Sequence, residues 1–270
     1  MKKWGEFMLV VKVGGGRGTD LEPLLGDLKG YKDYILVHGG SQEANDLSEK
    51  LGKPPRMVTS PSGYTSRATD RETLSILSMA YAGKINVGIV ERMQKLGINA
   101  VGLAGVDGRV LEGKRKDAIT IFENGKRKVL RDDYTGKIEK VNVRLLKLLL
   151  DGGFVPVLTL PGISYESDAI NFDADRAAAA VASAMGASAF VILSNVPGLL
   201  RDVTDPSSLI GSIDKNSIDQ YMDFAEGRMK KKVLGAKEAV DGGVPLVVIA
   251  GANVEKPVTS ALDGKGTVIK

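Results

Sequence analysis

One unit recurs along this chain: a helical stretch runs into glycine, then into a short run rich in Val, Ile and Leu, then into a turn of small residues. It occupies residues 91–108, 145–162, 177–198 and 236–253. The glycine is typical of a helix C-cap, and each apolar run is typical of a strand buried on both faces. Helices that alternate with such strands predict an α/β fold with an open, mainly parallel, doubly wound sheet.

Two further apolar runs, residues 7–13 and 34–40, indicate strands that end in glycines. In open sheets of this kind, ligands bind beyond the carboxyl ends of the strands. The glycine-rich turns are therefore where we expect a site.

The composition narrows the chemistry available there. With no cysteine and one histidine, the chain has no thiolate nucleophile and no Cys-ligated zinc, and a His-based metal site is disfavoured. No apolar stretch approaches the roughly 20 residues of a membrane span, and the apolar run at the start is too short for a secretion signal. We expect a cytoplasmic protein with no protein metal centre and no membrane contact, whose chemistry rests on Lys, Arg, Asp, Glu and backbone amides.

The first glycine-rich turn follows a strand that carries Lys12 near its carboxyl end. The segment "VVKVGGGRGTD" fits neither the Walker pattern nor the spaced glycines of a dinucleotide site. Its Gly14, Gly15 and Gly16 leave backbone N–H groups open to an anion. A purely structural turn is the alternative interpretation of this segment alone.

The second turn, "VHGGSQEAND", places Gly39 and Gly40 between a strand and an amphipathic helix. Their amides can face an anion at the helix N-terminus. We expect His38 to be a packed or hydrogen-bonded residue and not a catalytic base. The glycines, and not the histidine, form the site in this interpretation.

Three polar clusters stand at predicted helix starts. Arg67 precedes a helix capped by Asp70, and its guanidinium is suited to grip a carboxylate. The second cluster holds Asn171, Asp173 and Asp175 at the start of an alanine-rich helix. Helix capping and the helix dipole alone also explain acids at this position. The third is the run of lysines 230–232, which stands at the unfavourable end of the helix dipole and so indicates a nearby anion.

These parts together predict phosphoryl transfer without a P-loop. Two glycine loops, two lysines and an aspartate cover the charge on a transferring phosphoryl group. A carboxylate acceptor needs no general base, because it is already ionised at pH 7.

A basic hairpin interrupts the α/β alternation. Residues 118–130 predict two strands joined around Asn124-Gly125, since both residues tolerate positive φ. A solvated hairpin and a docking surface for an acidic partner are both open interpretations, whereas nucleic acid is disfavoured by the lack of interleaved aromatics. The candidate docking residues are Lys114, Arg115, Lys116, Lys126, Arg127 and Lys128.

Nearly the whole chain resembles the amino-acid kinase family, through "VVKVGGG", "VHGG", "GINAVGLAGVDG", "NFDADRAAAAVA", "ILSNVPGLL", "GRMKKKV" and "GTVI". The resemblance implies a three-layer αβα sandwich that works as a homodimer with ATP and Mg²⁺. It also implies an acyl-acceptor lobe over residues 1–173 and an ATP lobe over residues 174–270, with the sheet continuous across both.

The same resemblance assigns roles to single residues. Lys12 and Lys232 stabilise the transition state and Asp175 organises them. Gly39, Gly40, Arg67 and Asn171 hold the acceptor. The nucleotide is contacted by Gly14, Gly15, Ser194, Asn195, Gly198 and Leu199.

Within the family the chain is most similar to the branch that phosphorylates glutamate or 2-aminoadipate attached to a small acidic amino-group carrier protein of the LysW type, upstream of an acyl-phosphate reductase. The segment "GYTSRATDRETL" carries this likeness. Ser41 and Asn195 replace the family's usual Gly and Asp, and the short segment before Lys12 leads us to expect no feedback control by arginine. An N-acetylglutamate kinase and a non-catalytic nucleotide-binding regulator are the alternatives.

Overall fold

An eight-stranded sheet forms the frame of the molecule in the computed structural model, which describes residues 8–270 apart from 17, 62 and 124–125. All neighbouring strands are parallel except β15 and β16, so the prediction of an open, mainly parallel sheet is confirmed. The strands follow the order β14 (Ser212–Ile213), β16 (Thr267–Ile269), β15 (Val247–Gly251), β13 (Ala189–Ser194), β1 (Leu9–Val13), β2 (Tyr34–His38), β10 (Val155–Thr159) and β5 (Ala100–Ala104).

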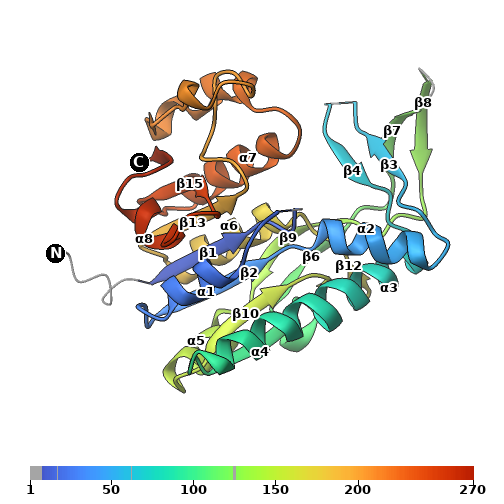
Figure 1. Ribbon diagram of the computed structural model, residues 1–270. Coiled ribbons are helices and arrows are strands. Elements are labelled where there is room, and N and C mark those ends of the chain that lie inside the picture. Colours follow the sequence, from blue (N-terminus) through green and yellow to red (C-terminus); the bar gives the residue numbers. More distant parts are fainter. Residues whose placement is uncertain (1–7, 17, 62, 124–125) are drawn as a thin grey trace.

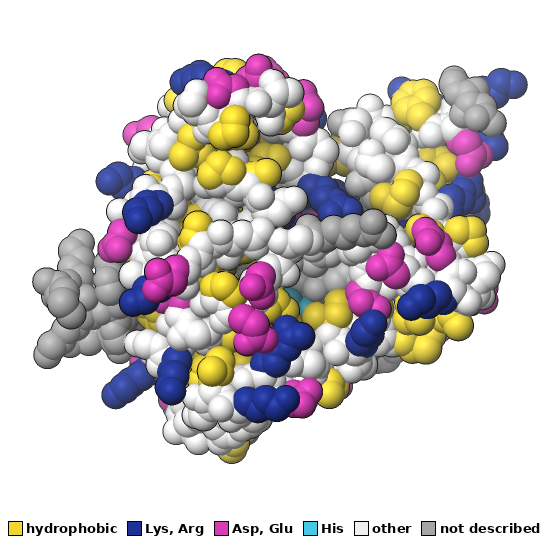
Figure 2. Space-filling model, viewed as in Figure 1, with side chains coloured by type: hydrophobic (Ala, Val, Ile, Leu, Met, Phe, Trp, Pro, Cys, Tyr) yellow, Lys and Arg dark blue, Asp and Glu magenta, His cyan; other side chains and the backbone are white. Residues whose placement is uncertain are grey.

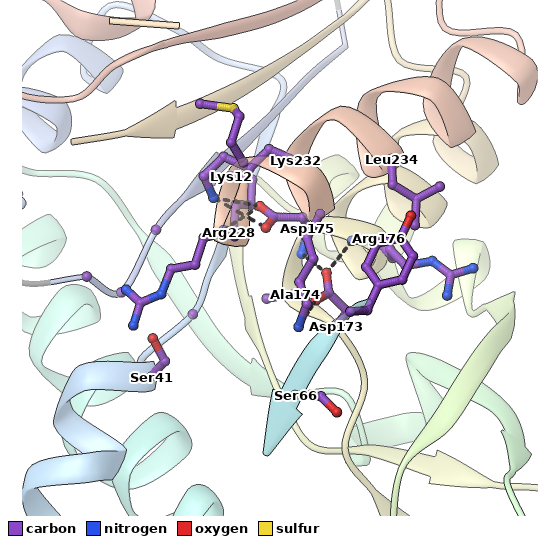
Figure 3. Close-up of a pocket in the computed structure, with 18 of the residues that line it drawn as sticks. Lys12, Ser41, Ser66, Asp173, Ala174, Asp175, Arg176, Arg228, Lys232 and Leu234 are labelled. Atoms are coloured by element: carbon purple, nitrogen blue, oxygen red, sulfur yellow. Dashed lines mark hydrogen bonds and ion pairs between the residues drawn. The ribbon is translucent and has the colours of Figure 1, made fainter. Parts of the chain in front are cut away.

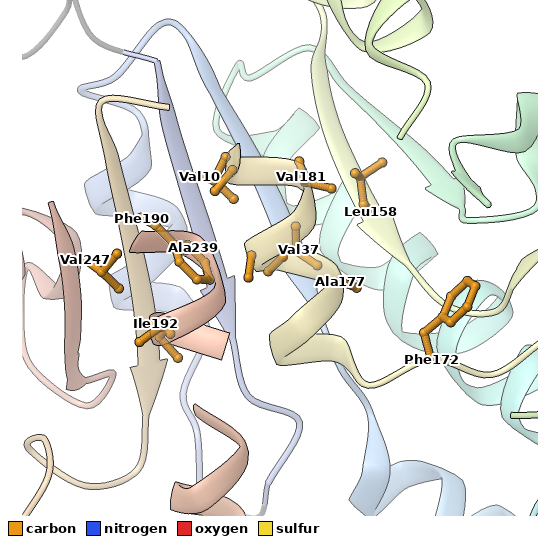
Figure 4. Close-up of a cluster of buried hydrophobic side chains, with 14 of the residues drawn as sticks. Val10, Val37, Leu158, Phe172, Ala177, Val181, Phe190, Ile192, Ala239 and Val247 are labelled. Carbon is orange, nitrogen blue, oxygen red and sulfur yellow. The ribbon is translucent and has the colours of Figure 1, made fainter. Parts of the chain in front are cut away.

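Helices cover both faces of this sheet and make three layers (Figure 1). Side chains alternate across a strand, so Val10 packs on one face of β1 while Leu9 and Val11 pack on the other. In Figure 4 the alanine-rich α6 (Ala174–Met185) lies over Val10, Val37 and Phe190. The same face carries α5 (Val143–Asp151) and α7 (Gly227–Asp241), and the other carries α1 (Glu22–Leu28), α4 (Val87–Lys95) and α8 (Pro257–Leu262).

A single long helix runs from Arg71 to Lys95 and includes α3 (Arg71–Ser78), a π-helical segment (Met79–Asn86) and α4. Contrary to our expectation from the sequence, its length and composition would allow it to cross a membrane. A core helix satisfies the same test, and Leu77, Ile89 and Met93 of this helix are buried in the two hydrophobic clusters.

Two small sheets rise beside the main one. The first has the order β12 (Ala169–Ile170), β11 (Gly162–Ser164), β6 (Leu111–Arg115) and β9 (Gly136–Val141), and the second β4 (Thr65–Arg67), β3 (Met57–Thr59), β7 (Ile119–Glu123) and β8 (Lys126–Leu130). The antiparallel pair β7–β8 confirms the hairpin, which projects at the upper right of Figure 1. Its Asn124-Gly125 turn lies outside the described residues. The remaining helices are α2 (Ser41–Lys50) and the 3₁₀ segments Asp107–Arg109, Pro206–Ser208 and Lys215–Phe224.

The two halves of the chain meet in the middle of the main sheet. Residues before 174 supply β1, β2, β10 and β5, and residues after it supply β13, β15, β16 and β14. Strands β1 and β13 pair over five residues, from Leu9 opposite Ala189 to Val13 opposite Leu193. The proposed acceptor and ATP lobes therefore share one continuous sheet.

Candidate active site

A cavity of about 1080 Å³ opens at the carboxyl ends of β1, β2 and β13, where the sheet topology predicts a ligand site. Figure 2 shows Lys and Arg side chains in the hollow between the half that carries α7 and the sheet that carries β3, β4, β7 and β8. Every catalytic, substrate-binding and nucleotide-binding residue predicted from the sequence lines this one cavity.

Asp175 bridges two lysines at the floor of the cavity (Figure 3). Lys12 Nζ lies 2.5 Å from Asp175 Oδ1, and Lys232 Nζ lies 3.3 Å from Oδ2. All three side chains are buried. Burial alone would raise the pKa of the Asp175 carboxyl, but the charges of Lys12 and then Lys232 hold it below its ordinary value. The carboxylate is therefore ionised and fixes both ammonium groups.

The bridged cluster leaves one positive charge without a buried counterion. Burial, followed by the charge of Lys12, lowers the pKa of Lys232 to about 8. Lys232 is thus mostly protonated at pH 7, and the cluster of two cations and one anion carries a net charge of about +1. A buried net charge is costly unless it is paired, so the cluster favours an anionic ligand.

Local structure explains why these three side chains converge. Lys12 shares a face of β1 with Val10, so the alternation of the strand directs it toward α6 and α7. Asp173 caps α6 by accepting hydrogen bonds from the N–H groups of Asp175 and Arg176, and this places Asp175 in the first turn. Lys232 extends from α7, which packs against α6.

The lysine run at the start of α7 meets acids and an aromatic ring. Lys231 Nζ lies 3.3 Å from Asp173 Oδ2, and Lys230 Nζ lies 5.1 Å from the centroid of the Tyr64 ring. These contacts offset part of the unfavourable position of the lysines in the helix dipole. They also join the start of α7 to the acceptor half of the chain.

The two glycine loops interlock. Gly14 N–H donates to Leu193 O, and Gln42 N–H donates to Gly15 O. A Cβ atom on Gly15 would stand 2.4 Å from Gly40 N, so only glycine permits this approach. Among the described residues no hydrogen bond is made by the N–H groups of Gly15 and Gly40, which leaves both amides for a ligand.

One expectation about these amides is wrong. Gly39 N–H donates to Val13 O at 3.3 Å and so extends the ladder between β1 and β2. Of the pair in "HGGS", only the Gly40 amide is left for an anion. The loop that carries Gly40 packs against the π-helical segment, because Tyr81 and Ile85 occupy the space that a side chain on Gly40 would need.

His38 is packed and hydrogen-bonded, as expected. Its Nδ1–H donates to Gly39 O, and its Nε2 accepts from Asn86 Nδ2 at 3.0 Å. Asn86 Nδ2 also donates to Val157 O. Burial is the main cause that lowers the pKa of His38 to about 4, so the ring is neutral at pH 7.

This neutral histidine predicts a pH-dependent stability. Unfolded His38 binds a proton below about pH 6.5, while the folded residue does so only below about 4. Its contribution is complete above pH 6.5 and is lost as the pH falls to about 4, for a total of about 3 kcal/mol. Between pH 7 and 5, denaturant unfolding should show wild type losing about 2 kcal/mol more than His38→Asn. Equal losses in both proteins would contradict the assignment.

Arg67 lies on β4 and lines the same cavity. Its Nη2 donates to Asn45 Oδ1 at 2.6 Å and to Ser41 O at 3.3 Å. Its Nη1 is buried and has no hydrogen-bond partner among the described residues. A buried guanidinium nitrogen without a partner is costly, which indicates that a ligand supplies the missing hydrogen-bond acceptor. Asn171 lines the same cavity, beside Phe172 and Asp173.

The predicted nucleotide residues follow β13. Ser194 and Asn195 line the cavity at the end of the strand, and Ser194 Oγ lies 3.4 Å from Asn195 Oδ1. Gly198 packs against Thr267, where no side chain would fit. The side chain of Leu199 is fully buried and its N–H donates to Thr267 Oγ1, so Leu199 shapes this end of the cavity from within the core.

The six predicted docking cations do not form one cluster. Lys114 and Arg115 lie on β6, and the Arg115 guanidinium stacks 3.7 Å from the centre of the Tyr134 ring. Lys116 is exposed and lines the cavity. The remaining three are exposed on β8, where Lys128 is paired with Glu123 and Arg127 lies over Phe122: Lys126, Arg127 and Lys128.

Sequence reasoning missed several residues that line the cavity. Arg228 stands just before the lysine run that we had singled out. Ser41 was noted from the sequence only as a departure from the family's usual glycine, and it lines the cavity as well. Tyr81 also lines the cavity and lies on the π-helical segment, which no sequence pattern signalled. A further cation in the same basic run of the sequence was the available signal for Arg228.

The comparisons with known proteins agree with this geometry. The model of the amino acid kinase family matches residues 8–251. A LysW-aminoadipate kinase of Deinococcus radiodurans is 58% identical over 97% of this chain and 91% of its own length, and an acetylglutamate kinase of Methanopyrus kandleri is 37% identical over 97% and 100%. The crystal structure of a carbamate kinase of Giardia lamblia bound to AMP-PNP has the same fold, with a TM-score of 0.68, 16% identity and coverage of 97% and 98%. Because the family model spans the fold and the whole cavity, this chain belongs to the amino acid kinase family.

Proposed function

We propose that the protein uses ATP to phosphorylate the side-chain carboxylate of 2-aminoadipate or glutamate that is attached to a small acidic amino-group carrier protein of the LysW type. The product would be an acyl phosphate in lysine or arginine biosynthesis. The observation that carries the proposal is the buried Lys12–Asp175–Lys232 cluster with its excess positive charge. It lines the same cavity as Gly15 and Gly40, whose amides make no hydrogen bond among the described residues.

In the proposed reaction the protein stabilises negative charge on the phosphoryl group and takes part in no proton transfer. The acceptor carboxylate is already ionised, and its oxygen attacks the γ-phosphorus of ATP as the bond to the bridging oxygen breaks and ADP takes the electron pair. Lys12, Lys232 and the Gly40 amide stabilise the charge that spreads over the transferring group. His38 cannot be the base, since its ring is buried and both its nitrogens are hydrogen-bonded.

Arg67 would position the acceptor. Its unpartnered Nη1 and the cavity wall at Asn171 suit a carboxylate or carbonyl oxygen of the attached amino acid. Ser194, Asn195 and Gly198 would line the nucleotide subsite, where the chain turns after β13.

Magnesium would enter with the nucleotide. Among the described residues, no group of three or more His, Asp and Glu side chains could hold a metal ion. Asp173 is engaged by helix N–H groups and Lys231, and Asp175 by two lysines. Mg²⁺ keeps several waters and binds readily to phosphate oxygens, so the donor set fits an ion carried by ATP that neutralises the phosphates.

Carrier-linked substrate explains features that a small acetylated substrate does not. The cavity extends along Lys116, Lys137 and Met57 and so reaches the second small sheet, in which β4 with Arg67 and the basic strand β8 are separated by two strands. Phe122 and Val129 are exposed on this sheet beside the cations of β8. An aromatic ring surrounded by cations is suited to bind an acidic protein. The 58% identical relative bears the name of a kinase for a LysW-linked substrate.

The test is to trap the acyl phosphate with hydroxylamine, using carrier-linked aminoadipate, carrier-linked glutamate and free N-acetylglutamate with ATP. We expect hydroxamate from a carrier-linked substrate only. Turnover of N-acetylglutamate at comparable kcat/KM would favour the acetylglutamate kinase named among the relatives. If none of the three substrates led to ADP formation, the non-catalytic nucleotide-binding regulator would be favoured.

Charge reversal on β8 tests the docking. We expect Lys126→Glu combined with Arg127→Glu to raise the KM of the carrier-linked substrate about tenfold while the KM of ATP changes less than about twofold, because exposed charges steer an acidic partner over a screening length of about 8–10 Å. The wild-type KM should rise steeply with ionic strength, and that of the variant less so. The exposed pair Lys256→Glu with Lys265→Glu, in the other half of the chain, is the matched control. Unchanged carrier kinetics would make the basic strand ordinary surface.

We also propose a cellular location and a next reaction step for the protein. It would be cytoplasmic and would pass its labile acyl phosphate to an acyl-phosphate reductase. It would be a homodimer, for which the exposed Met79 and Val87 on the long helix 71–95 offer an apolar face. Light scattering of the purified protein measures this directly, and a monomer mass would remove the dimer from the proposal.

A further inference from the structure

Arg228 reaches across the cavity from one half of the chain to the other. It stands in the first turn of α7, and its guanidinium points toward Ser41 at the start of α2 in Figure 3. Its Nη1 lies 3.4 Å from the position that a Cβ atom on Gly16 would take. The guanidinium thus lies against the glycine loop that follows β1, close to the floor of the cavity that holds Lys12.

Arg228 has no ion-pair partner within the part of the chain that the structure describes. Its neighbours Lys231 and Lys232 are each paired with a carboxylate. A second cation lies near Ser41, the residue toward which Arg228 points, since Arg67 Nη2 donates to Ser41 O. Burial lowers the pKa of Arg67, Tyr81 opposes this, and the positive charge of Arg228 lowers the pKa further.

The positive charges of Arg67 and Arg228 repel each other within the same cavity. An anion bound by both guanidinium groups would remove this repulsion. Arg67 has a buried nitrogen without a partner, which is a second and independent sign of a ligand at this place. Arg67 belongs to the acceptor half and Arg228 to the nucleotide half. The space between them is where the acceptor carboxylate and the γ-phosphoryl group would meet.

We propose that Arg228 is a further catalytic residue, which contacts the oxygens of the phosphoryl group during its transfer from ATP to the acceptor carboxylate. This rests on the proposed function. The new bond joins a carboxylate oxygen to the γ-phosphorus, the bond from that phosphorus to the bridging oxygen breaks, and ADP retains the electron pair without any proton transfer. Arg228 donates N–H groups to non-bridging oxygens and so adds a third cation to Lys12 and Lys232.

The position of Arg228 distinguishes this role from plain nucleotide binding. The nucleotide residues Ser194, Asn195 and Gly198 follow β13, whereas Arg228 lies against Gly16 and points to Ser41 in the acceptor half. A contact made only when both substrates are present acts on kcat and leaves the affinity for ATP nearly unchanged.

The variants Arg228→Ala and Arg228→Lys test the proposal in the hydroxamate assay with carrier-linked aminoadipate. We expect Arg228→Ala to lower kcat at least about tenfold with the KM of ATP within about threefold, and Arg228→Lys to recover part of the loss, because a lysine restores the charge without the fork of the guanidinium. Lys237→Ala is the control, since Lys237 lies on the same helix and pairs with Asp219 away from the cavity.

A second measurement reports the transition state without turnover. Arg228→Ala should lose at least about tenfold in affinity for ADP with aluminium fluoride and acceptor, and should bind ADP alone like wild type. Loss of ADP affinity instead, or a kcat equal to that of wild type, would overturn the proposal. If wild type itself forms no hydroxamate, the proposed function fails, and the assignment of Arg228 fails with it in a distinguishable way.

Discussion

Replacing Lys12 or Lys232 by methionine lowers kcat at least about a hundredfold, while the affinity for the carrier-linked acceptor changes far less. Each ammonium group stabilises charge that is larger in the transition state than in the bound substrates, so its loss appears in kcat. Methionine keeps the length of the apolar stem and removes only the charge. Single-turnover kinetics with the hydroxamate assay measure the effect, and near-normal turnover would remove that lysine from the mechanism.

Stability should move differently from activity in these variants. The cluster carries about +1 in wild type, because two buried lysines share Asp175. Removing one lysine leaves a neutral pair, so we expect no loss of folding stability. Asp175→Asn is the contrasting variant, since it leaves two buried cations without a carboxylate and should destabilise the fold. A Lys12→Met protein that unfolds as readily as Asp175→Asn would contradict this account of the charges.

Gly15→Ala is expected to lower kcat/KM by at least about a hundredfold without unfolding the protein, because misplacing the site by about 1 Å has an effect of that order. The added methyl would stand 2.4 Å from Gly40 N and 2.5 Å from Gly40 Cα. Both neighbours are backbone atoms, so the two glycine loops must separate. The Gly40 amide then moves relative to Lys12, which lines the same cavity.

The control for this variant is Gly26→Ala. Gly26 lies inside α1, and a Cβ atom there would meet nothing within 4 Å. Alanine in a helix interior is favoured over glycine by about 0.5–1 kcal/mol, so this variant should be active and slightly more stable. Thermal unfolding and kcat/KM are measured for both variants. Full activity in Gly15→Ala would mean that the loops do not need their close approach.

The fold could be predicted from the sequence because its signals are local. A glycine at each helix end and apolar runs between turns define helices and buried strands within a window of some ten residues. The same periodicity directs Lys12 toward one face of β1, and the capping preference of Asp173 places Asp175 in a first helical turn. Both residues stood out in the sequence through local context, Lys12 before a glycine turn and Asp175 at a helix start, whereas their catalytic roles came from the family resemblance.

What escaped prediction depends on contacts between distant segments. The N–H group of Gly39 donates to Val13 O because β1 and β2 are neighbours, and no pattern within the loop reveals this pairing. The basic residues around the hairpin divide between two sheets, and their pairing with Tyr134 and Glu123 follows from that division. Arg228 is one arginine in a basic run until the fold sets it opposite Arg67.

The shared central sheet has a consequence for how the chain can be cut. Strand β1 lies 180 residues before its partner β13 in the chain, as the pairing of Leu9 with Ala189 gives 189 − 9 = 180. Residues 1–173 alone would expose the Val-rich edge of β1, and an unpaired apolar edge recruits strands from other chains. The proposed boundary at residue 174 therefore lies within one folding unit, and we expect a fragment that ends there to aggregate more readily than the full chain.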